Sequence, residues 1–402
     1  MNNFQGNRLN RIREDLLMLS VFRGVLDHPV VNLFMRYAGH SGEDSTPKAS
    51  LYAEMVSKLY LSGESFTDHI ARLVFEDENV YVKQRAAGLT PNKSVSDAAK
   101  WELSALSRLA ELTSADFALD MGRDYVPAFE SRGVDLVREY EARLSDISRY
   151  GYGIFASSGM FRVTDEGEIV PIVSKDAVSM DSFIGYADER RRVLDNTVAF
   201  VEGAPAANTL LCGDAGTGKS STVKAVANHL FSRGVRLIEL RKDQLSRLPF
   251  VMGRISGNPL KFIIFIDDLS FNQNDDNFSM LKAALEGSAS AKAENAVIYA
   301  TSNRRHIIKE SFADREGDDV HRNDTLAETL SLSERFGLTV YFGKPDKKLY
   351  LEIVHTLCER FGVDIPEAQL DIEAEAFALR RGYRSARCAE HFVAELRRKK
   401  LQ

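Results

Sequence analysis

The sequence contains little cysteine and no long apolar run, and both absences narrow its class. The three cysteines among 402 residues, Cys212, Cys358 and Cys388, have no paired spacing. This argues against a disulfide framework or a cysteine metal site and is typical of a reducing compartment. No apolar stretch approaches the roughly 20 residues of a membrane helix, and the first six residues lack the charged start and apolar core of a secretory signal. We therefore expect a cytoplasmic protein that does not insert into a membrane.

The chain also lacks an excess of positive charge. The chain has 52 Lys and Arg residues against 58 Asp and Glu residues, which gives a formal net charge of −6. This balance argues against a protein that coats nucleic acid non-specifically, although it leaves local basic patches open. The hydrophobic content of 44% is ordinary for a folded protein, and the length allows two or three domains with substantial cores.

A glycine-rich segment is the strongest signal in the chain. Residues 213–220 read Gly-Asp-Ala-Gly-Thr-Gly-Lys-Ser, the pattern of a phosphate-binding P-loop, between a short apolar run and a helical pattern. The glycines let the backbone bend around phosphates, Lys219 can reach the β- and γ-phosphates, and the Ser220 hydroxyl can bind Mg²⁺. The helix that follows adds an N-terminus that favours an anion. The sequence thus predicts a nucleoside triphosphate site formed by Gly213, Asp214, Ala215, Gly216, Thr217, Gly218, Lys219, Ser220 and Ser221.

The spacing of apolar residues divides the chain. Helical spacing predominates over residues 1–150, a mostly helical accessory domain that begins with a broad apolar stripe from Leu9 to Leu26. Residues 151–180 read as a linker carrying a β-hairpin. Strands and helices then alternate over 181–344, which predicts an α/β domain, and 345–402 read as a helical lid. The expected fold class is α/β with a five-stranded parallel sheet, and the expected strands are Thr209–Cys212, Arg236–Leu240, Phe262–Ile266, Ala296–Ala300 and Leu338–Phe342.

Polar side chains follow two of these strands. Asp267 is placed to hold Mg²⁺ through its water shell, because this ion prefers oxygen ligands and keeps several waters. Asp268 can polarise the attacking water, and Asp275 and Asp276 are the alternative source of a base. Asn303 ends the next strand, where an amide can orient water without competing as a base. The expected metal ligands are Ser220 and Asp267, and the expected catalytic groups at these strand ends are Asp268 and Asn303.

Arginines nearer the C-terminus complete the set. Arg335 precedes the last strand and is a candidate arginine finger, since a guanidinium on a γ-phosphate stabilises the charge of phosphoryl transfer. A finger of this kind acts on the nucleotide of a neighbouring subunit, which implies a homo-oligomer. Arg384 and Arg387 open the last helix, and one of them is expected to contact the phosphates as the sensor of the lid. We prefer Arg387, because it falls on the helix.

The order of these motifs resembles that of the AAA+ ATPases, and residues 266–269 and 333–337 are most similar to the replication-initiator and helicase-loader branch. A closer resemblance, over roughly 181–399, is to an uncharacterised bacterial family of predicted ATPases, and residues 213–225, 262–271 and 314–319 carry it. It implies an AAA+ sheet with a helical lid, ATP and Mg²⁺ as ligands, a hexamer or open ring, and an adenine pocket lined by 183–186. Many relatives have Glu at the position of Asp268, so the carboxylate here has a shorter reach.

Several functions are compatible with these motifs. The leading one is an ATPase that hydrolyses ATP to ADP and phosphate in order to remodel or load a macromolecular partner, with an unknown protein bound through the N-terminal helical domain. The alternative is a slow-turnover switch or scaffold whose assembly is set by nucleotide, and Asp268 keeps it open. A small-molecule phosphotransferase is disfavoured by Arg335 and by the lid. The basic runs 304–306 and 397–400 leave contact with DNA open.

Overall fold

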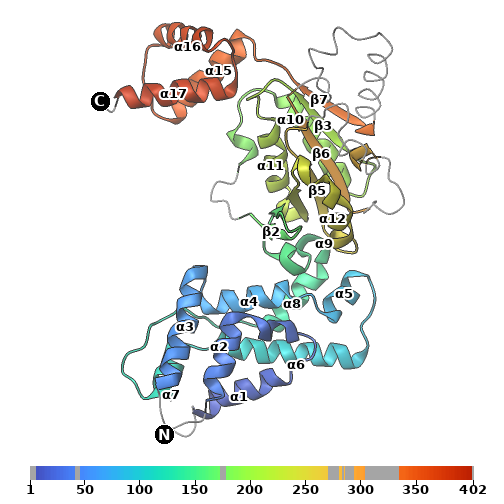
Figure 1. Ribbon diagram of the computed structural model, residues 1–402, viewed down its shortest axis with the longest axis vertical. Coiled ribbons are helices and arrows are strands. Elements are labelled where there is room, and N and C mark those ends of the chain that lie inside the picture. Colours follow the sequence, from blue (N-terminus) through green and yellow to red (C-terminus); the bar gives the residue numbers. More distant parts are fainter. Residues whose placement is uncertain are drawn as a thin grey trace. The chain divides into compact units, whose positions relative to one another are not determined.

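The computed structural model describes residues 6–40, 46–172, 178–269, 280–282, 285, 294–303 and 335–400. The chain divides into two compact units (Figure 1). Unit 1 comprises Met1–Ser157 and Gly257–Leu260, and unit 2 comprises Ser158–Ser256 and Lys261–Gln402. Within the described ranges, no helix is both long enough and apolar enough to cross a membrane.

Unit 1 is built of helices in the part of the chain that the structure describes. Its core joins side chains that are distant in sequence, such as Leu16, Phe34, Leu106 and Phe117, all fully buried. The helices are α1 (Gly6–Leu17), η1 (Arg23–Asp27), α2 (Pro29–Ala38), α3 (Thr46–Ser62), α4 (Phe66–Glu76), α5 (Val80–Ala86), α6 (Lys93–Ala110), α7 (Ser114–Met121), α8 (Leu136–Ser145), α9 (Ile147–Tyr150) and η2 (Gly153–Ala156).

The first apolar stripe does not form one continuous helix, because α1 ends at Leu17. The buried carboxylate of Glu102, on α6, accepts hydrogen bonds from the backbone N–H groups of the segment that follows. The distances are 2.8 Å to the nitrogen of Ser20, 3.0 Å to that of Val21 and 2.9 Å to that of Phe22. These N–H groups therefore bond to a side chain instead of to helical carbonyls, and the chain turns there while its apolar residues stay in the core.

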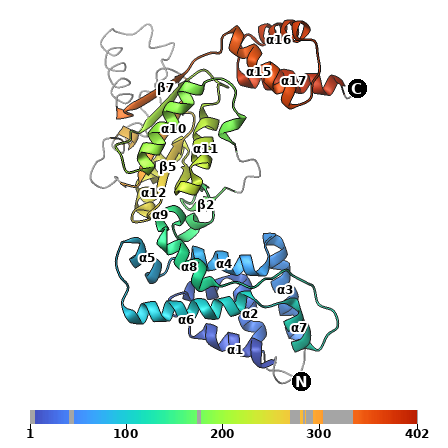
Figure 2. The ribbon, with the colours of Figure 1, turned by 180° about the vertical axis from the view of Figure 1, so that it is seen from behind.

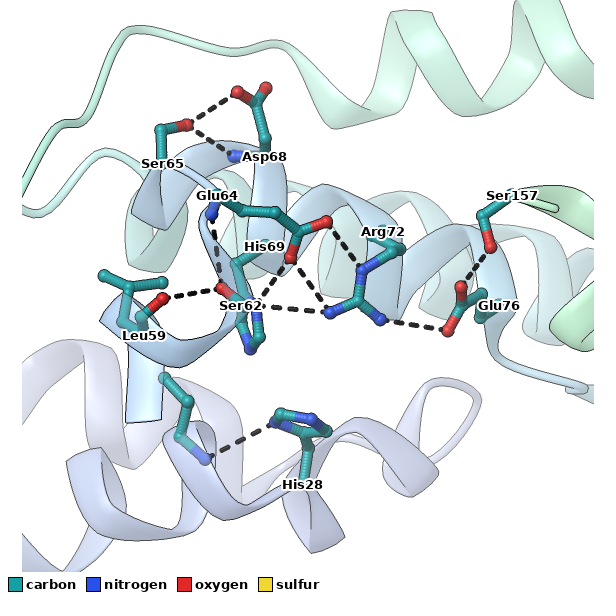
Figure 3. A network of polar contacts seen from close by, with 11 residues as sticks. His28, Leu59, Ser62, Glu64, Ser65, Asp68, His69, Arg72, Glu76 and Ser157 are labelled. Carbon is teal, nitrogen blue, oxygen red and sulfur yellow. Dashed lines mark hydrogen bonds and ion pairs between the residues drawn. The ribbon is translucent and has the colours of Figure 1, made fainter. Parts of the chain in front are cut away.

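A polar cluster on α4 contains the most buried histidine of unit 1 (Figure 3). His69 is 3% exposed, and its Nδ1 lies 2.8 Å from Oε2 of Glu64. Arg72 donates from Nε to Oε1 of Glu64 at 2.9 Å, and the ring of His28 lies 4.9 Å from the ring of His69. His28 also accepts a hydrogen bond from the backbone N–H of Val30 and so caps α2. Burial, followed by the charges of His69 and Arg72, lowers the pKa of His28 from 6.5 to about 4.

The lowered pKa of His28 predicts that protonation destabilises unit 1. Below pH 6.5 the unfolded chain binds a proton that folded His28 takes up only near pH 4, so the free energy of unfolding falls as the pH falls through this window. Asp77 acts in the opposite direction, because burial and the nearby acidic residues raise its pKa to about 6. A His28→Asn variant keeps a capping side chain and removes the titration. We expect it to lose less stability than wild type between pH 7 and pH 5, by about 1 kcal/mol after allowance for solvent screening.

Trp101, the single tryptophan of the chain, lies on α6 and makes this measurable. Its fluorescence during urea unfolding reports on unit 1 without interference from unit 2. If the unfolding midpoint depends on pH equally in wild type and in His28→Asn, protonation of His28 does not destabilise unit 1.

Unit 2 contains a seven-stranded sheet with the order β2-β1-β4-β5-β6-β3-β7. All five strands expected from the sequence are present and run parallel to their neighbours, which confirms the α/β class. The expected number of strands was wrong, because the hairpin of β1 and β2 joins the sheet: β1 pairs in parallel with β4, with Phe161 opposite Ile238. The strands are β1 (Met160–Val163), β2 (Ile169–Pro171), β3 (Thr209–Gly213), β4 (Val235–Glu239), β5 (Lys261–Ile266), β6 (Ala296–Ser302) and β7 (Leu338–Phe342).

Helices α10 and α11 lie along one face of this sheet, as both views show (Figure 2). Their apolar residues, such as Val193 and Val226, share a buried core with Ile263 and Phe265 of β5. Side chains of the alternate residues of β5 point to the other face and are buried too. The helices of this part are η3 (Met180–Ser182), α10 (Ala187–Val201), α11 (Lys219–His229), η4 (Phe231–Arg233), η5 (Lys242–Arg247) and α12 (Leu248–Ile255).

The C-terminal helices form a small bundle with its own core. Tyr350, Ala374 and Phe392 are buried in it, one from each helix, and Ile184 from the segment before α10 packs against them. The helices are α15 (Lys347–Arg360), α16 (Glu367–Arg381) and α17 (Ala386–Lys400). We refer to this bundle as the lid.

Candidate nucleotide-binding site

The loop between β3 and α11 has a conformation that depends on glycine. Gly213, Gly216 and Gly218 have φ angles of +137°, +75° and +87°, a region that other residues rarely adopt. A Cβ atom on Gly213 would lie 2.0 Å from the carbonyl oxygen of Phe342, so this position excludes any side chain on steric grounds as well. The loop thus leads from the buried strand to the first turn of α11, where helical N–H groups favour an anion.

Lys219 begins α11 and is only 5% exposed. Its Nζ donates to the carbonyl oxygens of Gly213 at 3.0 Å and Asp214 at 2.7 Å, and to Oδ1 of Asn303 at 3.0 Å. Burial lowers the pKa of Lys219, and the carboxylate of Asp214 opposes that shift. The ammonium group is therefore held at the loop by neutral oxygens that a phosphate can replace.

Asp267 follows β5 and is fixed by two hydroxyl groups. Its Oδ1 accepts from Ser220 Oγ at 2.6 Å and from Thr301 Oγ1 at 2.5 Å. Thr301 Oγ1 also accepts from the backbone N–H of Asp268 at 2.9 Å. The hydroxyl of Ser220, from α11, and the carboxylate of Asp267, after β5, thus meet, and hard oxygen atoms of this kind suit Mg²⁺.

Asp268 has a left-handed backbone, with φ +53°. Its Oδ1 accepts a hydrogen bond of 2.7 Å from Nδ2 of Asn303, whose Oδ1 binds Lys219. The amide of Asn303 therefore joins the lysine of the loop to the second carboxylate after β5. Asp and Asn tolerate the left-handed region better than most residues, because their short side chains can form local hydrogen bonds.

The two lid arginines differ in their contacts. Arg384 is held by Glu375, with distances of 2.9 Å from Nε to Oε1 and 2.6 Å from Nη2 to Oε2. Arg387 lies on α17, as the sequence predicts, is exposed, and lines the cavity at the P-loop. Ser385 caps α17 by accepting from the backbone N–H of Cys388 at 3.1 Å. A Cβ on Gly216 would lie 3.2 Å from Ser385 Oγ, so the P-loop and the start of α17 are in close contact.

One cavity of about 360 Å³ is lined by many of these groups. Residues 215–221 line it together with Asp267, Asp268, Thr301 and Asn303. Apolar side chains from the segment before α10 and from α15 line it as well, and Arg387 of α17 borders it. The volume lies in the range of small-molecule sites.

A family model described as "Protein of unknown function (DUF815)" matches residues 157–400. The chain belongs to this family. The match begins at the boundary between the two units, so the DUF815 region corresponds to unit 2. Among curated proteins, none matches the chain.

Solved structures with some likeness to this DUF815 chain include the RuvB Holliday junction branch migration motor of Thermotoga maritima. It shares 16% sequence identity at a TM-score of 0.37, and the match covers 54% of this chain and 63% of that one. Two variants of the same RuvB give TM-scores of 0.39 and 0.38 at 16% and 17% identity, over 54% of this chain and 64% and 63% of theirs. The DUF815 chain thus spans less than two thirds of the length of these RuvB chains, and a likeness at this level supports no statement about activity.

Thr301 and Arg190 are among the cavity residues that were not singled out from the sequence. Thr301 shares a strand face with Asn303, two residues on, so the alternation of β6 could have indicated it. Arg190 lies at helical spacing from Val193 and Thr197, on the buried side of α10. An arginine among the residues of the buried helix face is therefore the sequence feature that could have indicated Arg190.

Several sequence predictions lie outside the described residues. These are the alternative acids Asp275 and Asp276, the basic run 304–306, the segment 314–319, residues 270–271 of the segment 262–271, and residues 333–334 beside Arg335. Arg335 itself is described and does not line the cavity of 360 Å³. The remaining candidates, from Gly213 to Ser221 together with Asp267, Asp268, Asn303 and Arg387, belong to one region of unit 2.

Proposed function

We propose that the protein is an ATPase that binds Mg·ATP and hydrolyses it to ADP and phosphate in order to remodel or load a macromolecular partner. One observation carries this proposal: the Asn303 amide bonds both to Lys219 of the P-loop and to Asp268 after β5. A phosphate-binding lysine, a carboxylate and a water-orienting amide thus converge in one cavity. Phosphoryl transfer depends mainly on such positioning and charge stabilisation.

Ser220 and Asp267 would hold the magnesium ion. Their oxygen atoms lie 2.6 Å apart, and Thr301 donates to the same carboxylate oxygen. When bound, the ion neutralises phosphate charge and orients the β- and γ-phosphates. Lys219 would then exchange the carbonyl oxygens of Gly213 and Asp214 for phosphate oxygens.

Asp268 is the proposed group that polarises the attacking water, and Asn303 orients it. The hydrogen bond of 2.7 Å between them fixes the direction of the carboxylate. Arg387, which borders the cavity, is proposed to bind phosphate from the lid.

Arg335 is proposed to complete the site of a neighbouring subunit. Its position outside the lining of its own cavity supports an action in trans, and hence a homo-oligomer such as a hexamer or open ring. Unit 1 is proposed to bind the protein partner. Contact of residues 397–400 with DNA is a further outcome to be tested. A cytoplasmic location stays a prediction from the cysteine usage.

A slow-turnover switch is the second candidate function. Asp268 is one methylene shorter than Glu and already engaged by Asn303, which limits its reach toward a water molecule. A nucleotide-dependent change of assembly with little phosphate release would identify this function.

Replacement of Lys219 tests the site directly. Lys219→Ala should weaken ATP binding by about 100-fold or more, because several charge-assisted hydrogen bonds are lost at once. Lys224→Ala is the matched control, since Lys224 lies on the same helix and pairs with Glu239 away from the cavity. Isothermal calorimetry gives the affinity and circular dichroism checks the fold. Equal ATP affinity in wild type and Lys219→Ala would remove the P-loop assignment.

A further inference from the structure

Arg190 is a buried cation in the wall of the nucleotide cavity. It lies in the first turn of α10, is 7% exposed and lines the cavity. Its guanidinium carbon lies 4.7 Å from the centre of the Phe183 ring. Within the described chain, its side chain forms no hydrogen bond and no ion pair.

Folding alone does not explain a cation at this position. The N-terminal turn of a helix carries partial positive charge, which disfavours a further positive group. A buried guanidinium without an acceptor also loses hydration that one aromatic contact only partly replaces. Burial lowers the pKa of Arg190, with Glu189 opposing that shift. Arg191, the next residue on α10, is exposed and does not line the cavity.

Much of the neighbouring wall of the cavity is apolar, and Arg360 of α15, which donates to the carbonyl oxygen of Ser182 at 3.1 Å, also lines it. Phe183 and Ile184 precede α10, and Ile353 and Leu357 come from α15 of the lid. A Cβ on Gly218 would lie 3.8 Å from the Phe183 ring, so this wall adjoins the end of the P-loop. A largely apolar wall beside the N–H donors of Arg190, which have no partner among the described residues and line the cavity, fits a flat ring that carries acceptor atoms on its edge.

We propose that Arg190 recognises the base of the nucleotide by donating to a ring nitrogen of a purine. Adenine offers such acceptors at N1, N3 and N7, and a guanidinium can donate to a purine ring nitrogen, as it does to N7 of guanine in DNA. The inference rests on the proposed function, because it takes the phosphates to lie in the P-loop. Arg190 is thus a specificity-determining residue, and the loop at 213–218 supplies affinity for the phosphates.

The test compares Arg190→Met with Arg191→Met in the full-length chain. Calorimetry with Mg·ATP should show a Kd raised about tenfold or more for Arg190→Met, the loss expected for one charge-assisted hydrogen bond, and an unchanged Kd for Arg191→Met. Magnesium tripolyphosphate, which has no base, should bind both variants and wild type equally. Wild-type ATP affinity in Arg190→Met would overturn the role in base recognition and leave the ATPase proposal standing. Absence of ATP and tripolyphosphate binding in wild type would instead overturn both.

Analogues that lack one ring nitrogen separate recognition from a packing role. Wild type should bind one of 1-deaza-, 3-deaza- and 7-deaza-ATP about tenfold more weakly than ATP, and Arg190→Met should bind that analogue and ATP equally. If wild type binds all three analogues with the affinity that it has for ATP, the guanidinium does not bind a ring nitrogen. The same conclusion follows if the ratio of ATP affinity to analogue affinity is the same in Arg190→Met as in wild type. A lowered melting temperature of Arg190→Met with an unchanged ratio of ATP to analogue affinity would assign Arg190 to packing against Phe183.

Discussion

Arg335→Ala should bind ATP with wild-type affinity as a single chain and hydrolyse it on the order of 10³-fold more slowly, or worse. The reason is that Arg335 lies outside the cavity of its own chain, so that its guanidinium is expected to act on the γ-phosphate of a neighbour. Calorimetry measures the binding, and phosphate release at protein concentrations that permit assembly measures the turnover.

Mixing two inactive variants provides the control for this prediction. Arg335→Ala keeps an intact P-loop and Lys219→Ala keeps an intact Arg335, so a mixed interface should recover part of the activity. A cis-acting or merely structural Arg335 gives no recovery at any ratio. An absence of recovery, with mixed assembly shown independently by light scattering, would remove the main reason for proposing an oligomer.

Asp268→Asn should retain Mg·ATP and lose turnover by about 10²- to 10⁴-fold, the usual contribution of a positioned general base. The amide preserves both an acceptor for Asn303 and a residue type that tolerates φ +53°, so only the charge and basicity at this position change. Single-turnover phosphate release and calorimetry separate the two effects.

The matched comparison is Asp267→Asn, which should weaken the dependence of ATP binding on Mg²⁺, because Asp267 contacts Ser220. Hydrolysis by Asp268→Asn at the wild-type rate would show that the base lies elsewhere, for instance at Asp275 or Asp276. The Asp268→Asn protein is also suited to capturing a partner, since it should remain in the ATP-bound state.

The sequence predicts the parallel strands well, because each is a short, almost wholly apolar run between turn signals, such as Lys261–Ile266. It does not predict that Met160–Val163 pairs with β4, since four residues define a strand but carry no information about its partner. The early end of α1 depends on Glu102, which is distant in sequence from the N–H groups that it binds. Long-range contacts of this kind leave no local pattern.

The residues of the candidate site also differ in how well the sequence predicts them. The sequence predicts the P-loop, because phosphate binding requires glycines and a lysine at fixed spacing. The contact of Asn303 with Lys219 and Asp268 follows from strand order, which brings the ends of β3, β5 and β6 together and which no single segment encodes. The sequence does not predict the left-handed backbone of Asp268 either. This conformation gives a physical reason for Asp instead of the longer Glu at this position.

Because Ser385 at the start of α17 lies close to Gly216, a shift of the P-loop would be transmitted to this end of the helix. With 15 residues, α17 extends for about 22 Å, so a tilt of about 10° at Ser385 would displace its far end by about 4 Å. That end carries Arg397, Arg398 and Lys399, so a small tilt of α17 at the P-loop would move these three cations by a larger distance. A molecule bound to these three residues would therefore respond to a movement of the P-loop without contacting it. A force on this end of α17 would in turn displace the loop.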